Sequence, residues 1–266
     1  MMKSFAWLAC LPLLGACATA NMVRPEVVKD LAPTGTLRAA INFGNPVLAQ
    51  KDPVTGEPRG VSVDMARELG RRLALPVELI TYDAAGKVFD ALKTGAWDVA
   101  FLAIDPARAT EIAFTAPYVV IEGTYLVPAD SPLRTIEDVD RQGVRVAVGN
   151  KSAYDLYLTR TLKRAQLVRA PTSPAAVEAF MKDRLEAAAG VKQPLVQFAK
   201  TNPTVRVMDG RFMAIEQAMG TPKGRESGAR YLRAFVEEMK ASGFVATGLE
   251  RSGQRDATIA PPSPSQ

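Results

Sequence analysis

The chain has 266 residues, of which 47% are hydrophobic and 23% are charged, and its formal net charge is +5. This length suits two modest lobes or one large globular domain, and the positive residues form no aromatic-studded basic run, so we expect no nucleic-acid partner. The sequence contains no histidine, which argues against hydrolase chemistry, and we expect no catalytic residue, metal or cofactor.

Residues 1–20 have the pattern of a bacterial export signal. A positive start is followed by an apolar run, residues 5–14, that is too short to span a bilayer. Residues 14–17 are similar to the lipobox of bacterial lipoproteins, which implies acylation of Cys17. The alternative is a soluble form cleaved by ordinary signal peptidase near Ala20. The only other cysteine, Cys10, lies in the same segment, so the mature body has no disulfide.

The next part of the chain alternates predicted strands and helices. We predict a tether at 21–35 with a possible short helix, a strand at 36–42, a loop at 43–46, a turn-rich excursion at 51–59, a helix between 60 and 76, and a strand at 77–81. Ser62 can cap this helix, and Asp64 adds a favourable negative charge to its first turn.

The stretch from Trp97 to Leu126 contains the first candidate for ligand binding. Val99 to Ile104 is an apolar run of strand length, and Asp105-Pro106 ends it. Arg108 follows at once, at the carboxyl end of this strand, where open α/β sheets bind their ligands. Its planar guanidinium can donate two parallel hydrogen bonds to a carboxylate.

The sequence also contains an internal repeat. Residues 88–101 and 176–189 both read as a helix, a short connection, an acidic residue and a strand of small apolar residues, and 37–41 has a counterpart at 144–148. We therefore predict two lobes on related α/β plans that share a cleft. The chain should cross near 122–126 and return near 215–218. A long amphipathic helix at 225–242 follows, and the Pro/Ser-rich end from residue 252 reads as disordered.

Four motifs carry a resemblance to a known family. The sequences GVSVDMA at 60–66, DPAR at 105–108, IAFTAPY at 112–118 and GVRVAVGNKS at 143–152 resemble the bacterial extracytoplasmic solute-binding proteins of the amino-acid-binding family, which are the receptors of ABC importers. The resemblance covers residues 35–250 and implies a two-lobed periplasmic-binding-protein fold of type II, with a hinge of two crossover segments. The expected division is a signal at 1–20, a tether at 21–35, lobe 1 at 36–124 and 216–251, lobe 2 at 125–215, and a disordered tail at 252–266.

The resemblance also implies a carboxylate site. Arg108 matches the arginine that grips the ligand carboxylate, and the loop from Gly149 to Ser152 matches one that contributes a hydroxyl and backbone amides. Ser152 and Asp155 form a plausible capping box, and helix starts of this kind bind anions. Lys151 stands where the family has its hydroxyl, which adds a further cation.

The residues that would bind an ammonium group are missing. Phe101 and Ala103 replace hydroxyl residues of the family, and Val191, followed by Lys192, replaces its carboxylate. We therefore expect a small organic acid without an α-ammonium. The predicted ligand-binding residues are Phe43, Phe101, Ala103, Arg108, Asn150, Lys151, Ser152, Val191 and Lys192.

The expected function is that of a periplasmic receptor for a small anionic or amino-acid-like solute, delivered to an ABC permease in the inner membrane. We expect a monomer that touches the membrane only through a lipid anchor. One alternative is an enzyme on the same fold, such as a cyclic-carboxylate dehydratase, with Asp105, Glu122 or Glu216 as its acid. Another is a ligand-sensing or docking subunit.

Overall fold

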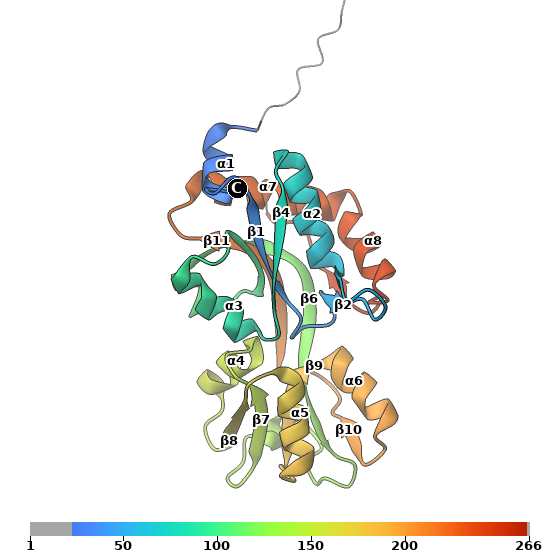
Figure 1. Ribbon diagram of the computed structural model, residues 1–266. Helices are drawn as coiled ribbons and strands as arrows, with labels where there is room; N and C mark the ends of the chain where they lie inside the picture. The colour runs from blue at the N-terminus through green and yellow to red at the C-terminus, as the bar shows by residue number, and fades with distance from the viewer. Residues whose placement is uncertain (1–22, 265–266) are drawn as a thin grey trace, which may run out of the picture.

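The computed structural model describes residues 23–264, which form two α/β lobes joined by shared strands (Figure 1). The main sheet has the strand order β4-β1-β5-β11-β6-β9-β7-β8, and β10 and β12 both pair with β6. The predicted two-lobed α/β organisation is confirmed.

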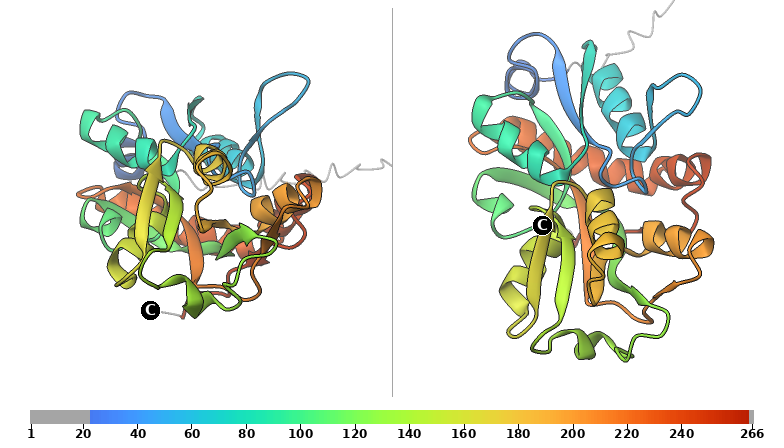
Figure 2. Two further views of the ribbon diagram at one scale, coloured as in Figure 1. Left: turned by 90° about the horizontal axis from the view of Figure 1, so that it is seen from below. Right: turned by 60° about the horizontal axis from the view of Figure 1, so that its bottom comes forward.

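The upper lobe in Figure 1 contains the parallel strands β1 (Leu37–Asn42), β4 (Val77–Tyr82) and β5 (Val99–Ala103). Its helices are α1 (Pro25–Leu31), α2 (Val61–Leu73), α3 (Ala85–Ala91), α7 (Glu226–Ala241) and α8 (Phe244–Arg251), with the 3₁₀ turns η1 (Leu92–Thr94) and η2 (Arg108–Thr110). β2 (Gln50–Lys51) and β3 (Pro58–Arg59) belong to a loop that projects from this lobe (light blue, Figure 2).

The lower lobe repeats this plan. The parallel strands β7 (Arg145–Gly149), β8 (Gln166–Ala170) and β9 (Ala187–Val191) lie among helices α4 (Ala153–Thr161), α5 (Ser173–Lys182) and α6 (Lys192–Thr201). The turn η3 (Ile136–Val139) and the short strand β10 (Val205–Val207) complete it.

Two long antiparallel strands join the lobes. β6 (Ile112–Pro128) and β11 (Met213–Pro222) pair with each other over residues 112–123 and 213–222. β11 also pairs with β5 of the upper lobe, and β6 also pairs with β9 of the lower lobe. The predicted lobe boundaries, 124/125 and 215/216, fall inside these two strands.

The internal repeat is present in the register of the parallel strands of each lobe. Ala39 of β1 lies beside Val99 of β5, and Val146 of β7 lies beside Ala187 of β9 in the other lobe. The side chains of these strands are buried in continuous apolar cores, as expected for parallel strands covered on both faces.

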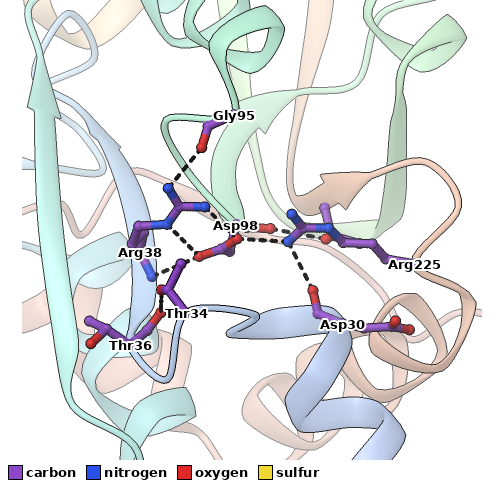
Figure 3. Close-up of polar contacts among 8 residues, drawn as sticks. Asp30, Thr34, Thr36, Arg38, Gly95, Asp98 and Arg225 are labelled. Carbon is purple, nitrogen blue, oxygen red and sulfur yellow. Dashed lines mark hydrogen bonds and ion pairs between the residues drawn. The ribbon is translucent and has the colours of Figure 1, made fainter.

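Each lobe also contains an arginine–carboxylate pair at the amino ends of these strands. Arg38, at the start of β1, donates through its backbone N–H, Nε and Nη2 to Asp98, which precedes β5 (Figure 3). Arg145, at the start of β7, makes the same three kinds of contact with Glu186, which precedes β9. We call these contacts the upper and lower clasps.

The upper clasp has a second arginine and is more deeply buried. Nη1 of Arg225 donates to Oδ1 of Asp98 at 2.8 Å and to the carbonyl oxygen of Asp30 in α1 at 2.8 Å (Figure 3). The side chain of Asp98 is 0% exposed, whereas that of Glu186 is 36% exposed. Burial raises the pKa of Asp98, but the hydrogen bonds from Arg38 and Arg225 outweigh it and hold this pKa below its usual value.

Both ends of the described chain pack against the body. The possible short helix of the predicted tether is present as α1, whereas residues 258–260 of the predicted disordered tail are ordered. Within the expected tether, α1 buries Leu31 completely, because the helix has an apolar face that lies against α7. Within the expected disordered tail, β12 (Thr258–Ile259) pairs with β6, and the N–H of the buried Ala260 donates to the carbonyl oxygen of Tyr118. The disordered tail was predicted from Pro/Ser composition alone, and composition gives no information about the free edge of β6 with which β12 pairs.

The start of α2 also differs from the prediction. Gly60, with φ of +115°, is the N-cap, and Ser62 lies inside the helix with its hydroxyl 3.0 Å from that of Tyr118. A Cβ at Gly60 would lie 2.5 Å from the carbonyl oxygen of Leu48, so both the backbone conformation and the close approach require glycine.

The export signal and Cys17 lie outside the described residues. Among residues 23–264, no helix is both long enough and apolar enough to span a bilayer.

Candidate functional site

Two neighbouring cavities lie between the lobes. The larger has a volume of about 420 Å³ and mainly apolar walls. Phe43 and Pro46 of the upper lobe and Val177, Pro194, Leu195 and Phe198 of the lower lobe contribute to these walls. The smaller has a volume of about 30 Å³ and is lined by Arg108 and several uncharged polar side chains. The cavities share the walls formed by Gly44, Tyr154, Ser173 and Val191.

Arg108 reaches the smaller cavity from η2, directly after β5. Its side chain is buried, and it donates from Nη1 to the carbonyl oxygen of Ala103 at 3.0 Å and from Nη2 to that of Lys151 at 2.8 Å. Burial lowers the pKa of Arg108 to about 10, although the carboxylate of Asp105 opposes this change. The guanidinium is therefore still charged at neutral pH, and its Nε has no hydrogen-bond partner among the described residues.

Three polar contacts connect the lobes next to this site. One is the bond from Arg108 to the backbone of Lys151, and a second is the ion pair between Nζ of Lys151 and Asp90 of α3 at 2.7 Å. The third joins Arg160 of α4 to Asp105 at 2.8 Å. A Cβ added at Gly86 of α3 would lie 2.8 Å from the Cβ of Lys151, so the two lobes are too close at this point to accommodate a side chain on residue 86.

The predicted anion-binding loop before α4 is partly occupied by the protein's own carboxylate. Ser152 caps α4 by accepting from the N–H of Asp155, which is one half of the predicted capping box, whereas the N–H of Ser152 donates to the carbonyl oxygen of Gly149. The carboxylate of Asp155 accepts from the N–H of Lys151, at 2.7 Å, and from Arg169. This N–H is therefore bonded internally, whereas Ser152 itself still lines the smaller cavity.

The polar groups around the smaller cavity include a second atom without a partner. Asn45 is 6% exposed, and its Oδ1 has no hydrogen-bond partner among the described residues. Gln217 of β11 and the hydroxyl of Tyr154, which donates to that of Ser173 at 2.7 Å, lie on the same walls. Within the described part of the chain, no aspartate or glutamate lines this cavity, and the larger one has only the exposed Glu178.

Five of the predicted site residues line the cavities. Phe43 lies on the larger one, Ala103, Arg108 and Ser152 on the smaller one, and Val191 on both.

The other four have different surroundings from those predicted. Phe101 is 2% exposed and packs in the core, with its ring edge-on to Tyr118, because residue 101 lies deeper in β5 than Ala103 does. Lys192 bonds to Glu122 at 2.8 Å instead of facing the cleft. Lys151 is neutralised by Asp90, and the exposed Asn150 approaches α3 without lining either cavity.

Sequence reasoning missed Asn45, Tyr154, Ser173 and Gln217. Asn45 and Ser173 follow β1 and β8, at the carboxyl ends where ligands bind in such sheets, so position alone could have suggested them. Gln217 lies within a long strand, and its sequence context gives no such signal.

The carboxylates considered as enzymatic acids have clear structural partners or lie exposed. Glu122 accepts from Lys192 and Arg211, and the hydrogen bond from Lys192 is the main reason that the pKa of Glu122 is lowered. Asp105 pairs with Arg160, and Glu216 is exposed on β11. Within residues 23–264, no group of three metal-binding side chains comes together.

Comparisons with known proteins agree with this architecture. The amino-acid-binding protein AabA of Dichelobacter nodosus is 21% identical over 195 residues, which cover 71% of this chain and 77% of that protein. A mutant of ArgBP from T. maritima superposes with a TM-score of 0.73 at 21% identity, covering 85% of this chain and 99% of the other. An ancestral amino acid-binding protein, a precursor of cyclohexadienyl dehydratase, superposes with a TM-score of 0.70 at 22% identity, covering 84% and 98%.

These structural likenesses confirm the type II periplasmic-binding-protein fold, and the family follows from a match to the sequence itself. Residues 38–251, which are most of the chain, match the model of the bacterial extracellular solute-binding proteins, family 3. The two lobes, the shared strands and the cavities between them are the parts that such a receptor needs. The chain belongs to the bacterial extracellular solute-binding proteins of family 3 and is an extracytoplasmic solute-binding receptor.

Proposed function

We propose that this receptor binds a small carboxylate that lacks an α-ammonium and delivers it to the permease of an ABC importer. The observation that carries the proposal is the buried guanidinium of Arg108, whose Nε is unpartnered among the described residues. Arg108 belongs to the wall of a cavity that no carboxylate of the described residues lines.

The charges around Arg108 favour one bound anion. Its nearest carboxylate, Asp105, already pairs with Arg160. Two guanidinium groups and one carboxylate therefore leave one net positive charge, which a single carboxylate neutralises. A buried charge is stable only when it is paired in this way.

The walls of the cavities disfavour an ammonium group. Val191, at the position of the family's carboxylate, lines both cavities, and Lys192 is bonded elsewhere. Desolvating an ammonium without an anionic partner costs several kcal/mol. For an α-amino acid, the carboxylate would therefore contribute favourable binding free energy and the ammonium would contribute unfavourable binding free energy.

Delivery to a permease follows from the two-lobed architecture. Closure of the lobes around a solute produces a surface that differs from that of the open form, and a membrane partner can recognise this difference. We propose anchoring through acylated Cys17, with release after cleavage near Ala20 as the alternative, and a monomeric state.

An enzyme on this fold is the second candidate, because one structural neighbour is a precursor of cyclohexadienyl dehydratase. Glu122 and Asp105 are ion-paired and Glu216 is exposed, so none of these three candidate acids is available at the cavities, and we propose binding without turnover. A docking subunit would have the same fold but would bind no small acid.

A thermal-shift screen of the purified protein tests the proposal. The panel contains the standard amino acids, monocarboxylic acids and dicarboxylic acids, and each stabilised sample is then checked for chemical change of the ligand. A ligand at a hundredfold over its Kd stabilises by about 2.7 kcal/mol, which raises Tm by roughly 5–11 °C in a protein of this size.

Two variants make the screen specific. Arg108→Ala should abolish the shift, whereas Arg211→Ala, which removes an exposed arginine at the hinge, should preserve it. Stabilisation by amino acids alone, or an undiminished shift in Arg108→Ala, would refute the proposed ligand class. Loss of the bound acid with time would support the enzyme instead.

A further inference from the structure

The smaller cavity contains two unpartnered polar atoms of opposite kind. Nε of Arg108 is a donor and Oδ1 of Asn45 is an acceptor, and both are buried without a partner among the described residues. Both residues line the same space of about 30 Å³. A buried polar atom without a partner is unfavourable, so a polar group that occupies this space and reaches both atoms should be favoured.

A carboxylate satisfies only one of these atoms. It accepts from Nε of Arg108, but it offers no hydrogen to Oδ1 of Asn45. Because both residues line one small space, a donor on the carbon next to the carboxylate is the best placed to reach Asn45 while the carboxylate bonds to Arg108.

A hydroxyl and an ammonium are the common groups that donate from this position. The ammonium would bring a second charge to a neutral amide, with Val191 on the neighbouring wall and no carboxylate around the cavity. A hydroxyl is neutral, and the amide oxygen alone satisfies it. The hydroxyl is therefore the better match to Asn45.

The rest of the ligand must suit the larger cavity. Its walls of Phe43, Val177, Leu195 and Phe198 favour an apolar body, and its volume of about 420 Å³ is within the range of small-molecule sites. The shared walls of the two cavities allow one molecule to occupy both.

We infer that the ligand is a 2-hydroxy acid with a branched or aromatic apolar body, and that Asn45 selects its hydroxyl. This inference rests on the proposed function, since it assumes that Arg108 binds the carboxylate.

Calorimetric titration with matched acids tests the hydroxyl alone. The first set is 2-hydroxy-4-methylpentanoate, 4-methylpentanoate, 4-methyl-2-oxopentanoate and leucine, which share one carbon skeleton. The second set is 3-phenyllactate, 3-phenylpropionate, phenylpyruvate and phenylalanine. In at least one set, the hydroxy acid should bind tenfold or more tightly than the other three members.

Asn45→Asp is the decisive variant, because it has nearly the same shape and adds the carboxylate that an ammonium needs. The preference should move from the hydroxy acid toward leucine or phenylalanine by at least tenfold. Asn45→Ala should bring the hydroxy acid and the unsubstituted acid to within about threefold of each other. Thermal unfolding without ligand confirms that each variant is folded.

The outcomes separate this inference from the proposed function. If acids bind through Arg108 but the hydroxyl gives no advantage, or if Asn45→Asp leaves the ranking unchanged, the 2-hydroxy acid is wrong and the carboxylate receptor stands. If no acid of either set binds, the apolar body is wrong. If binding is insensitive to Arg108→Ala, the proposed function itself fails.

Discussion

Replacing Asp98 by asparagine should destabilise the protein far more than the equivalent change in the other lobe. Asp98→Asn removes the charge of a fully buried carboxylate and leaves Arg38 and Arg225, each 22% exposed, without their anion. Breaking a buried ion pair on one side costs about 3–5 kcal/mol. Since both arginines retain some access to water, we expect a loss of about 3 kcal/mol, which lowers Tm by roughly 6–12 °C.

The lower clasp supplies the matched control. Glu186→Gln changes the same kind of pair, but the side chains of Glu186 and Arg145 are 36% and 39% exposed. Pairs of this exposure contribute about 0–1 kcal/mol. Urea unfolding at neutral pH measures both variants, and equal losses would refute the argument from burial.

The same pair of variants has a pH signature. The folded-state pKa of Asp98 lies below its usual value, so this carboxylate stabilises the fold above its unfolded pKa of about 4. The stabilisation is lost as the pH falls through the lower, folded-state pKa. The stability difference between wild type and Asp98→Asn should therefore be constant above about pH 4 and should shrink as the pH falls further. A difference that stays constant well below pH 4 would exclude the charge as its cause.

Three further predictions concern the cleft and the hinge. Gly86→Ala should stabilise helix α3 by up to about 1 kcal/mol but should hinder closure of the lobes against Lys151. Tm should therefore be kept, ligand affinity should fall, and small-angle scattering should show a larger radius of gyration. Unchanged affinity would contradict this. Arg160→Ala removes the ion pair between Asp105 and Arg160, an arginine whose side chain is 43% exposed. This change should weaken ligand binding by less than about fivefold and reduce the dependence of Kd on salt. Glu122→Gln removes the anion that pairs with Lys192 and Arg211 and should lower the free energy of unfolding by at most about 1 kcal/mol at neutral pH. Urea unfolding should show that this loss vanishes as acid protonates Glu122 in the wild type.

The fold was predictable because its signals are local and repeated. The apolar runs at 37–41, 99–103 and 144–148 are largely buried strands, and those at 37–41 and 144–148 lead through loops to the helices α2 and α4. The recurrence of an acidic residue before β5 and β9 was visible in the sequence, but the arginines that pair with Asp98 and Glu186 lie 60 and 41 residues away. Such pairing becomes visible only when the parallel register is known.

The site was less predictable because it depends on contacts between the lobes. Arg108 was identified from its position after a strand, and Val191 from the family pattern. The bonds from Lys192 to Glu122 and from Lys151 to Asp90 connect elements whose relative placement the sequence does not give. From the sequence alone, a lysine near the cleft is therefore interpreted as a ligand-binding cation. The structure shows that a nearby carboxylate pairs with each of these lysines.

Residues at the amino ends of the parallel strands contribute to stability, and residues at the carboxyl ends form the candidate ligand site. The clasps lie at the amino ends of β1, β5, β7 and β9, where each carboxylate is paired within its own lobe. Asn45, Arg108 and Ser152 follow the carboxyl ends of β1, β5 and β7, where polar groups find their partners across the cleft or remain unpartnered among the described residues. Removing a clasp charge should thus lower stability and leave ligand affinity unchanged, because the lobes keep their cleft surfaces. Changes at Asn45 or Arg108 should do the reverse, since atoms that lack partners contribute little to folding and are free to select a ligand.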